Sequence, residues 1–197
     1  GAAARDALWQ VIEGARSSLD VGTFIIGSDA FGQQVMERLV RRAREGIKVR
    51  VLLDGFGALT LPRRCFDQLR EAGGDVTVFR PLFSLRNTGP RNLRNHRKVT
   101  IADDQWLWSG GRNLAGEYFL GNEAYPQPWR DLSFDLRGNV AAAAARQFAH
   151  DWASVRKRKP RAIPDLPDVP GTSLAQYLPS GPDQTEDTAQ ALLIDAC

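Results

Sequence analysis

The chain has 197 residues, of which 43% are hydrophobic and 25% charged, so it is long enough to bury the core of one domain or of one domain and part of another. Its 26 Lys and Arg residues stand against 23 Asp and Glu residues, and a net charge of +3 excludes overall charge as an argument for a nucleic-acid partner. Two distant cysteines argue against a disulfide framework and for a reducing compartment.

The first eighty residues alternate between helical and strand-like patterns. Apolar residues recur at helical spacing around Val11, a second helix begins at Ser28 or Asp29 and ends at Gly46, and Pro62 opens a third. The expected elements are helices at 7–16, 28–46 and 61–72, and strands at 19–26, 47–54 and 75–79. This alternation predicts an α/β domain with a mixed, largely parallel β-sheet flanked by helices on both faces.

The pattern changes after Pro81. A loop rich in Arg, Asn, Gly and Pro precedes two short strands, which meet at Asp103-Asp104 and predict a hairpin. The expected bounds are a loop at 83–93, strands at 98–102 and 106–108, a helix at 113–120, a loop at 121–130, a strand at 132–136 and a long Ala-rich helix at 139–156.

The composition changes again near Val155, where a basic run is followed by a Pro-rich stretch typical of a linker. The apolar spacing at the very end repeats that of the N-terminal helix. We therefore predict a first domain at 1–158, a linker at 159–181 and, at 182–197, the opening helix of a second domain that is cut short.

The stretch NHRKVTIADDQWLWSGGRN concentrates chemically useful side chains in the order H-x-K, four residues, D, six residues, G-G-x-N. Its members are His96, Lys98, Asp103, Gly110, Gly111 and Asn113. A histidine and a lysine two positions apart on an extended segment share one face. The imidazole can attack phosphorus in a phosphodiester, while the ammonium holds the negative charge that the attack builds. For H-x-K alone, an exposed strand with ordinary polar residues is the commoner explanation, so the hypothesis depends on the whole spacing.

The Gly-Gly turn leaves the backbone open to a phosphate. Asn113 is predicted just after it, at a helix N-terminus that favours anions. Arginines ahead of and within the motif predict contacts with an anionic headgroup or a nucleic-acid backbone, with solvated surface as the alternative: Arg80, Arg86, Arg91, Arg94 and Arg97.

Other polar residues are weaker candidates. Asp54 is expected to end a strand, with a site-facing position as the alternative, and His150 is expected to be structural or solvent-facing. The stretch 27–32 lacks the glycine spacing of a nucleotide-binding loop. No cluster of His, Cys or acidic residues has metal-ligand spacing, so we expect no metal and no cofactor.

The spacing His96-x-Lys98-x4-Asp103-x6-Gly110-Gly111-x-Asn113 resembles the HKD motif of the phospholipase D superfamily. Longer segments are similar to the bacterial cardiolipin synthase branch: LRNHRKVTIADDQWLWSGGRNLAGEYF, WRDLSFDLRG, FAHDW and LPSGPD. The resemblance covers nearly the whole chain. It implies a phospholipase D-like αβα sandwich that forms the first catalytic half of a longer enzyme.

The resemblance also implies roles for single residues. His96 would be the nucleophile that forms a phosphohistidine, and Lys98 and Asn113 would bind the phosphoryl oxygens. Asp103 would have more of a structural role. Asp131 would hydrogen-bond His96 and fix its tautomer, with a simple pairing to Arg130 as the alternative. Gly110, Gly111, Arg94 and Arg97 are expected near the substrate.

The function implied is phosphatidyl transfer from a phosphatidylglycerol-like phospholipid, or hydrolysis of the same bond as in a phospholipase D. The leaving alkoxide must be protonated, and the family uses a second HKD histidine for this step. It would come from a missing C-terminal domain or a homodimer partner, so this chain alone is expected to be weak or inactive. One alternative is a homodimeric phosphodiesterase or endonuclease acting on nucleic acid, which is less favoured, and another is a non-catalytic half-domain that binds anionic lipid.

The basic run at 156–161 predicts attraction to an anionic membrane surface, with a solvated linker as an equal alternative. No apolar run reaches the roughly 18 residues that span a bilayer. We expect a soluble or peripheral location on the cytoplasmic side. The N-terminal residues lack a signal-peptide layout. They read as if they begin inside a helix, so a targeting segment upstream stays an alternative.

Overall fold

A computed structural model describes residues 1–82, 93–121, 123–167, 171 and 174–184. Its helices are α1 (Ala2–Gly14), α2 (Ala30–Arg44), α3 (Arg63–Glu71) and α4 (Asn139–Arg156), with short 3-10 helices η1 (Gly57–Leu59) and η2 (Gly116–Tyr118). Its strands are β1 (Ser18–Thr23), β2 (Lys48–Asp54), β3 (Asp75–Phe79), β4 (Val99–Ala102), β5 (Trp106–Gly110) and β6 (Ser133–Arg137). These bounds confirm the predicted elements to within about three residues, except that α1 begins at Ala2 instead of Ala7 and that the helix expected at 113–120 does not form. Most of the loop expected at 83–93 lies outside the described residues.

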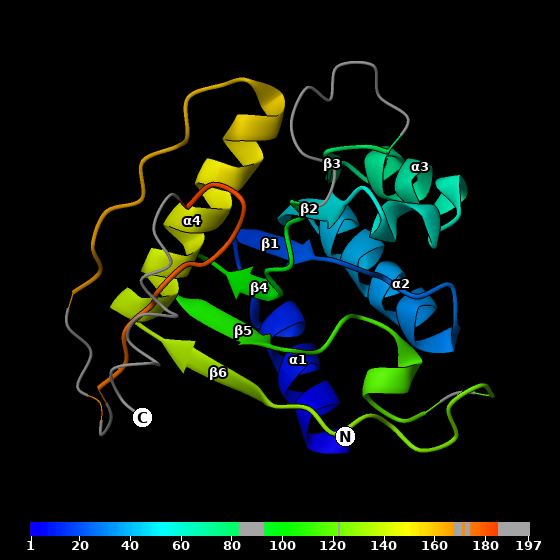
Figure 1. Cartoon of the computed structure of the whole chain (residues 1–197). Coiled ribbons are helices and arrows are strands. Elements are labelled where there is room, and N and C mark those ends of the chain that lie inside the picture. Colours follow the sequence, from blue (N-terminus) through cyan, green and yellow to red (C-terminus); the bar gives the residue numbers. More distant parts are fainter. Residues whose placement is uncertain (83–92, 122, 168–170, 172–173, 185–197) are drawn as a thin grey trace.

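The strands form one six-stranded sheet in the order β3-β2-β1-β4-β5-β6 (Figure 1). Strand β2 is parallel to both of its neighbours, whereas β4, β5 and β6 continue the sheet in antiparallel fashion. The mixed sheet is therefore confirmed, but its parallel part is confined to the first three strands. The reason is that the β4–β5 hairpin pairs directly with β1, and a hairpin brings its own antiparallel pairing.

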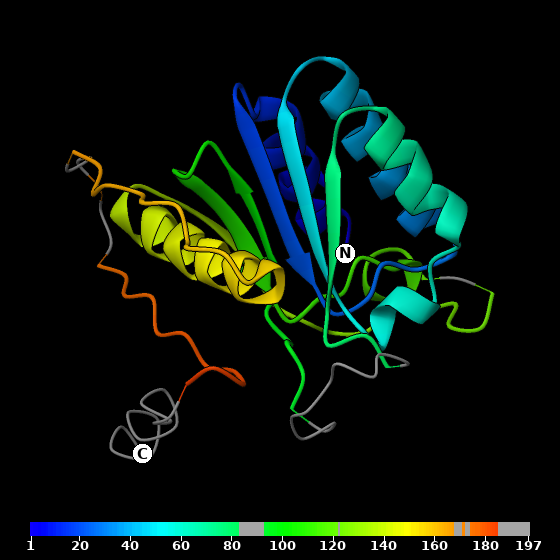
Figure 2. The same cartoon turned by 90° about the horizontal axis from the view of Figure 1, so that it is seen from above.

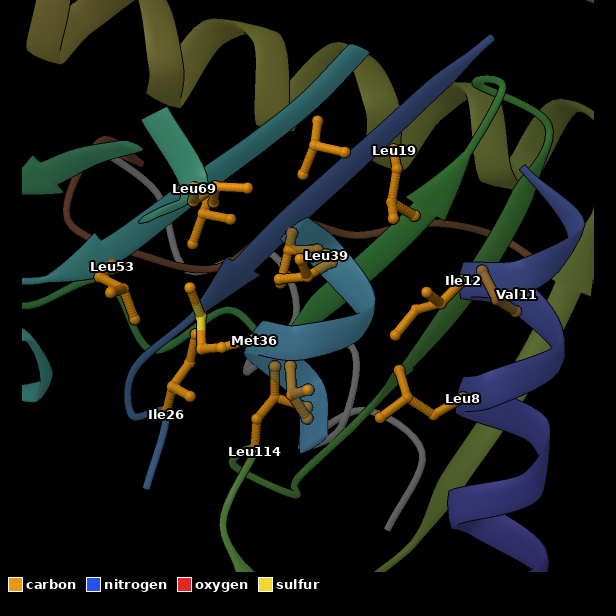
Figure 3. Packing of buried hydrophobic residues seen from close by; sticks show 14 of the residues in the cluster. Leu8, Val11, Ile12, Leu19, Ile26, Met36, Leu39, Leu53, Leu69 and Leu114 are labelled. Atoms are coloured by element: carbon orange, nitrogen blue, oxygen red, sulfur yellow. The ribbon is translucent and has the colours of Figure 1, made fainter. Parts of the chain in front are cut away.

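Helices cover both faces of the sheet, as predicted. Helices α2 and α3 lie on one face and α4 on the other (Figure 2). On the first face, Leu8 and Ile12 of α1 and Leu39 of α2 are buried together beneath the sheet (Figure 3). On the second face, small Ala residues of α4 and the ring of Phe148 pack in one buried cluster with strand residues such as Leu52 and Val99. Covering both faces explains why β1, β2 and β4 are buried along nearly their whole length.

A buried ion pair joins the neighbouring strands β1 and β2 on the α4 face. The guanidinium of Arg50 donates to both carboxylate oxygens of Asp20, at 2.7 Å through Nε. The guanidinium carbon also lies 5.3 Å from the ring centroid of Phe148. Burial raises the pKa of Asp20, and the hydrogen bonds and charge of Arg50 oppose that rise.

The described part of the tail lies over the α4 face. Ile163 is buried there, and Leu166 and Tyr177 pack partly buried beside it. The linker and domain boundaries predicted from composition stay predictions, and the helix expected at 182–197 lies almost entirely outside the described residues. Within the described ranges, no helix combines the length and apolar character needed to cross a bilayer.

The pairing register shows which polar residues share one edge of the sheet. Strands β1 and β2 end at Thr23 and Asp54, and the antiparallel partner β4 begins at that same edge, with Val99 opposite Gly22. The segment 93–98 therefore enters the sheet where β1 and β2 leave it. This edge is where the residues of the H-x-K sequence meet other parts of the chain.

Candidate active site

Three residues of the motif converge on the two residues that follow β1. The imidazole of His96 stacks on Phe24, with ring centroids 4.2 Å apart. The Lys98 ammonium lies 5.8 Å from the centroid of the same ring. Next to Phe24, the backbone N–H of Ile25 donates to Asn113 Oδ1 at 3.3 Å. The imidazole, the cation and the amide are thus assembled around Phe24 and Ile25.

Asn113 is buried, and its amide is held at both ends. Besides accepting from Ile25, it donates through Nδ2 to the hydroxyl of Tyr118 at 2.9 Å. An amide nitrogen carries two protons, so one donor is left after the Tyr118 bond. The amide therefore has a fixed direction and one N–H available to an acceptor.

The prediction that Asn113 begins a helix is wrong. The backbone N–H of Leu114 donates to Ile25, and Leu114 accepts from Gly27, which forms a short parallel bridge with the chain after β1. The Leu114 carbonyl, which would accept from the N–H of Tyr118 in an α-helix, is thus already used by Gly27, and a side-chain oxygen of Asp29 accepts from the N–H of Gly116. Only the 3-10 turn Gly116–Tyr118 remains of the expected helix.

The electrostatics of the pair favour a neutral imidazole. Partial burial lowers the pKa of His96, the nearby Lys98 lowers it further, and the carboxylate of Asp54 acts in the opposite direction. Burial also lowers the pKa of Lys98, while Asp131 opposes this effect. The Lys98 ammonium donates to the carbonyl of His96 at 2.7 Å, which ties the two residues together through the backbone.

Asp131 lies near Lys98 and against the glycines. A Cβ at Gly111 would lie 2.4 Å from Asp131 Oδ1, and a Cβ at Gly110 would lie 2.2 Å from the carbonyl oxygen of Leu132. Gly110 also has a φ of +147°. Both glycines are thus needed to bring the chain before β6 close to β5. Among the described residues no hydrogen bond joins Asp131 to His96, so that pairing stays a prediction.

Asp103 lies at the opposite edge of the sheet from His96, since Ala102 at the end of β4 faces Leu19 at the start of β1. Its carboxylate accepts from the backbone N–H groups of Arg16, Ser17 and Ser18 and from the Ser17 hydroxyl, at 2.7 to 2.9 Å. It also has a φ of +53° in the hairpin turn. This geometry fits the structural role expected for Asp103 and leaves it far from the candidate nucleophile.

The residues before His96 are held in place by Asp54. One Asp54 oxygen accepts from the backbone N–H of Asn95 at 3.1 Å, and the carboxylate lies 3.6 Å from a guanidinium nitrogen of Arg94. Arg94 is buried, donates to the carbonyl of Arg80 at 2.8 Å and lies over the ring of Phe56. The Arg94 guanidinium therefore stabilises the segment that precedes His96. Its predicted contact with substrate stays a prediction.

Arg97 does not share the His96 face. Alternation along the segment directs Asn95 and Arg97 the other way, and both side chains bond Asp151 of α4, at 2.9 Å through Asn95 Nδ2 and 2.8 Å through Arg97 Nη1. The structure therefore gives no support to the expected substrate contact of Arg97. Arg86 and Arg91 lie outside the described residues.

Sequence reasoning missed Phe24 and Tyr118. Phe24 falls within the strand predicted at 19–26, whereas β1 ends at Thr23 and leaves Phe24 beside His96. Tyr118 follows Asn113 by five positions and carried no signal of its own. Phe24 is recognisable as a partner of His96 only once the pairing of β1 with β4 is known.

His150 is half-exposed on α4, as expected, but it has neighbours that the sequence did not indicate. Its imidazole lies 3.9 Å from Asp151 and 3.7 Å from Asp183. Potential ligand atoms of these three residues lie within 4.8 Å of one another. Both carboxylates are already paired with the guanidinium of Arg97, and this positive charge disfavours a metal ion between them.

The fold, the H-x-K pair and the amide define a phospholipase D-like domain. The chain belongs to the family described as "Cardiolipin synthase, PLD-like domain", whose model matches residues 8–152. The cardiolipin synthase A of Pseudomonas putida strain W619 is 36% identical over 197 residues, which are 100% of this chain and 41% of that protein. The cardiolipin synthase A of Pseudomonas aeruginosa strain LESB58 is 34% identical over 99% of this chain and 40% of that protein. The chain thus spans about 40% of the length of the curated relatives it matches.

Solved structures share the fold at low sequence identity. NucT from Helicobacter pylori superposes with a TM-score of 0.56 at 17% identity, covering 78% of this chain and 89% of that one. Nuc, a phospholipase D family member from Salmonella typhimurium, gives 0.54 at 15% identity over 78% of this chain and 87% of that one. A phosphatidylserine synthase of Haemophilus influenzae gives 0.54 at 18% identity over 76% of this chain and 34% of that one. These likenesses support the αβα architecture.

Proposed function

We propose that this chain forms the nucleophile-bearing half of a phosphatidyltransferase that acts on a phosphatidylglycerol-like phospholipid. The observation that carries the proposal is the convergence of His96, Lys98 and Asn113 on Phe24 and Ile25. The family match and the similarity to cardiolipin synthase A proteins support a phosphodiester substrate.

In the proposed reaction a ring nitrogen of His96 attacks the lipid phosphorus. A nitrogen–phosphorus bond forms while the bond from phosphorus to the leaving headgroup oxygen breaks, which gives a phosphohistidine and an alkoxide. Lys98 and the remaining N–H of Asn113 stabilise the charge on the non-bridging oxygens. An acceptor alcohol then attacks phosphorus and releases His96, and water in the same role gives hydrolysis.

The alkoxide must be protonated, and this chain has no suitable second histidine. It contains two histidines, and the second, His150, lies on α4 beside Asp151 and Asp183, away from the Phe24 ring. We therefore propose that the proton donor comes from a second HKD half, in the natural full-length chain or in a homodimer partner. The chain alone would be weak or inactive.

We also propose a peripheral membrane contact through the basic run at 156–161, with fewer of its residues than the sequence suggested. Arg156 hydrogen-bonds Thr77 at 2.7 Å, and Arg161 bonds Asp104 at 2.7 Å, so these two charges are used within the domain. Lys157, Arg158 and Lys159 are exposed. These three would attract an anionic lipid surface, each by about 1 kcal/mol.

The proposal is tested by product analysis of the full-length protein with phosphatidylglycerol vesicles, with and without added alcohols, by mass spectrometry. We expect a lipid product in which the phosphatidyl group has moved to an alcohol, and its loss in His96→Ala. His150→Ala is the matched control and should keep the activity.

Two other outcomes decide between functions. Phosphatidic acid as the sole product would make the protein a phospholipase D. Salt-dependent DNA binding with DNA cleavage, and no lipid turnover, would replace the proposal by a nucleic-acid phosphodiesterase. Equal activity in His96→Ala and the wild-type protein would contradict the proposed nucleophile.

A further inference from the structure

The segment that carries His96 is held by side chains and not by a strand ladder. Residues 93–98 precede β4 and belong to no strand. Within this segment, Asn95 Oδ1 accepts from the backbone N–H of Arg97 at 3.0 Å. Asn95 also donates to Asp151 of α4 at 2.9 Å. The direction of the His96 side chain therefore depends on what fixes its neighbours from behind.

The strongest of these attachments is the guanidinium of Arg97. Its Nη1 donates to both oxygens of Asp151, at 2.9 and 2.8 Å, and its Nη2 donates to Asp183 at 2.5 Å. Only 10% of the Arg97 side chain is exposed. A buried guanidinium that loses one of its carboxylates retains an incompletely compensated charge, so its position is sensitive to either partner.

Asp183 comes from the far end of the described chain, beyond the Pro-rich stretch. Gln147 of α4 bridges the two carboxylates, donating to Asp151 at 2.9 Å and to Asp183 at 2.8 Å. A Cβ at Gly181 would lie 2.5 Å from Arg97 Nη2, so this part of the chain lies directly against the guanidinium. Figure 1 shows the segment around 180 folded back along α4.

We propose that Asp151, Arg97 and Asp183, here called the Arg97 clamp, position His96 for phosphodiester transfer, and that Arg97 and Asp183 are positioning residues. Because side chains alternate along 95–98, a guanidinium fixed on the α4 side sets the direction of the imidazole and the ammonium on the other side. The catalytic part of this inference rests on the function proposed above. Through the clamp, the orientation of His96 would depend on whether the segment around Asp183 is bound to Arg97.

The clamp is tested with Asp183→Ala and Asp183→Asn in the full-length protein. Hydrogen exchange of the peptide covering 93–98 reports the order of the segment without requiring activity. We expect faster exchange in Asp183→Ala and a smaller effect in Asp183→Asn, which keeps an acceptor for Arg97. With phosphatidylglycerol vesicles, kcat should fall about ten- to hundredfold while KM stays within about twofold, since geometry and not binding is lost.

The matched control is Asp165→Ala. Asp165 is a linker carboxylate that pairs with Arg146 of α4 at 3.0 Å, but it is 81% exposed and this pair does not include Arg97. It should change neither exchange nor kcat. Unchanged exchange at 93–98 in Asp183→Ala, or an equal effect of Asp165→Ala, would overturn the clamp.

The two proposals fail separately. Faster exchange in Asp183→Ala with unchanged kcat would contradict the positioning role. If the wild-type protein turns over no phosphodiester but Asp183→Ala still exchanges faster at 93–98, the clamp is supported as the contact that orders this segment. The proposed function is then overturned.

Discussion

His96 stacks on Phe24 with ring centroids 4.2 Å apart and an interplanar angle of 28°. The two residues are 72 positions apart in the chain and meet because β4 pairs antiparallel with β1. Phe24 thus provides an apolar surface on which the imidazole is oriented, and the same ring lies below the Lys98 ammonium.

Replacing Phe24 should weaken the orientation of His96. A stacked aromatic pair is worth about 0.5–1.5 kcal/mol, so Phe24→Ala is expected to lower kcat/KM by roughly two- to tenfold. Phe24→Tyr retains the ring and should stay near the wild-type value. The measurement is steady-state turnover of phosphatidylglycerol vesicles by the full-length protein, and wild-type rates in Phe24→Ala would show that the stacking has no catalytic role.

Removing the charge of Lys98 should change the pKa of His96. Burial is the main cause that lowers the pKa of His96 and remains after mutation, whereas the Lys98 charge also lowers it and is removed in Lys98→Met. Loss of a nearby positive charge favours the imidazolium, so the pKa of His96 should rise in the variant. An NMR titration of the His96 imidazole in the wild-type protein and in Lys98→Met measures this shift. A fall in the pKa of His96, or no change, would contradict the closeness of the Lys98 ammonium to the imidazole.

Asp103 should matter for stability and not for chemistry. Asp103→Asn keeps the shape and tolerates the positive φ but cannot accept all four hydrogen bonds from 16–18. We expect the free energy of unfolding to fall by about 1.5–3 kcal/mol, the range for hydrogen bonds to a charged group. Urea unfolding measures the loss. The kcat of the folded protein should be unchanged, and a large fall in kcat without loss of stability would assign Asp103 to catalysis.

The stabilisation by Asp103 should also depend on pH. Burial by itself raises the pKa of its carboxyl, but the hydrogen bonds from Ser18, Ser17 and Arg16 outweigh burial and the folded pKa is lowered. A lowered folded pKa means that the stabilisation is complete above the ordinary value near 4 and is lost as the pH falls through the folded pKa. The stability gap between wild type and Asp103→Asn should therefore close in acid. A gap that widens below pH 4 would reverse the sign.

Gly111 should be intolerant of a side chain because of Asp131. The Cβ of Gly111→Ala would lie 2.4 Å from Asp131 Oδ1, and overpacking of this kind costs about 1–3 kcal/mol. Adding Asp131→Ala should recover part of the stability lost in Gly111→Ala, which a double-mutant cycle by thermal unfolding measures. Strict additivity of the two changes would show that the glycine is required for another reason.

The sequence was sufficient to predict the local elements of the fold. Period and breaker residues place nearly every helix and strand, and Gly46 ends α2 as expected. The sequence predicted a mixed sheet but no strand order, because the position of β4 beside β1 depends on pairing between segments about eighty residues apart. The short parallel bridge at Leu114 replaced a predicted helix for the same reason.

In the candidate site, too, local features could be predicted from the sequence and long-range contacts could not. The shared face of His96 and Lys98 follows from strand alternation and could be predicted. The direction of Arg97 also follows from alternation, but its partners Asp151 and Asp183 lie 54 and 86 positions away and gave no signal in sequence. Phe24 was hidden for a related reason, since its role depends on where β1 stops.

The central claim is that His96 accepts the phosphatidyl group, and the most direct measurement is to trap that adduct. The full-length protein would be quenched during turnover of isotopically labelled phosphatidylglycerol, and its peptides analysed by mass spectrometry under conditions that preserve phosphoramidates. We predict a labelled adduct on the peptide containing His96 and none on the peptide containing His150. Turnover with the label on another residue of this chain, or with no label on His96 even when breakdown of the adduct is slowed, would contradict the account.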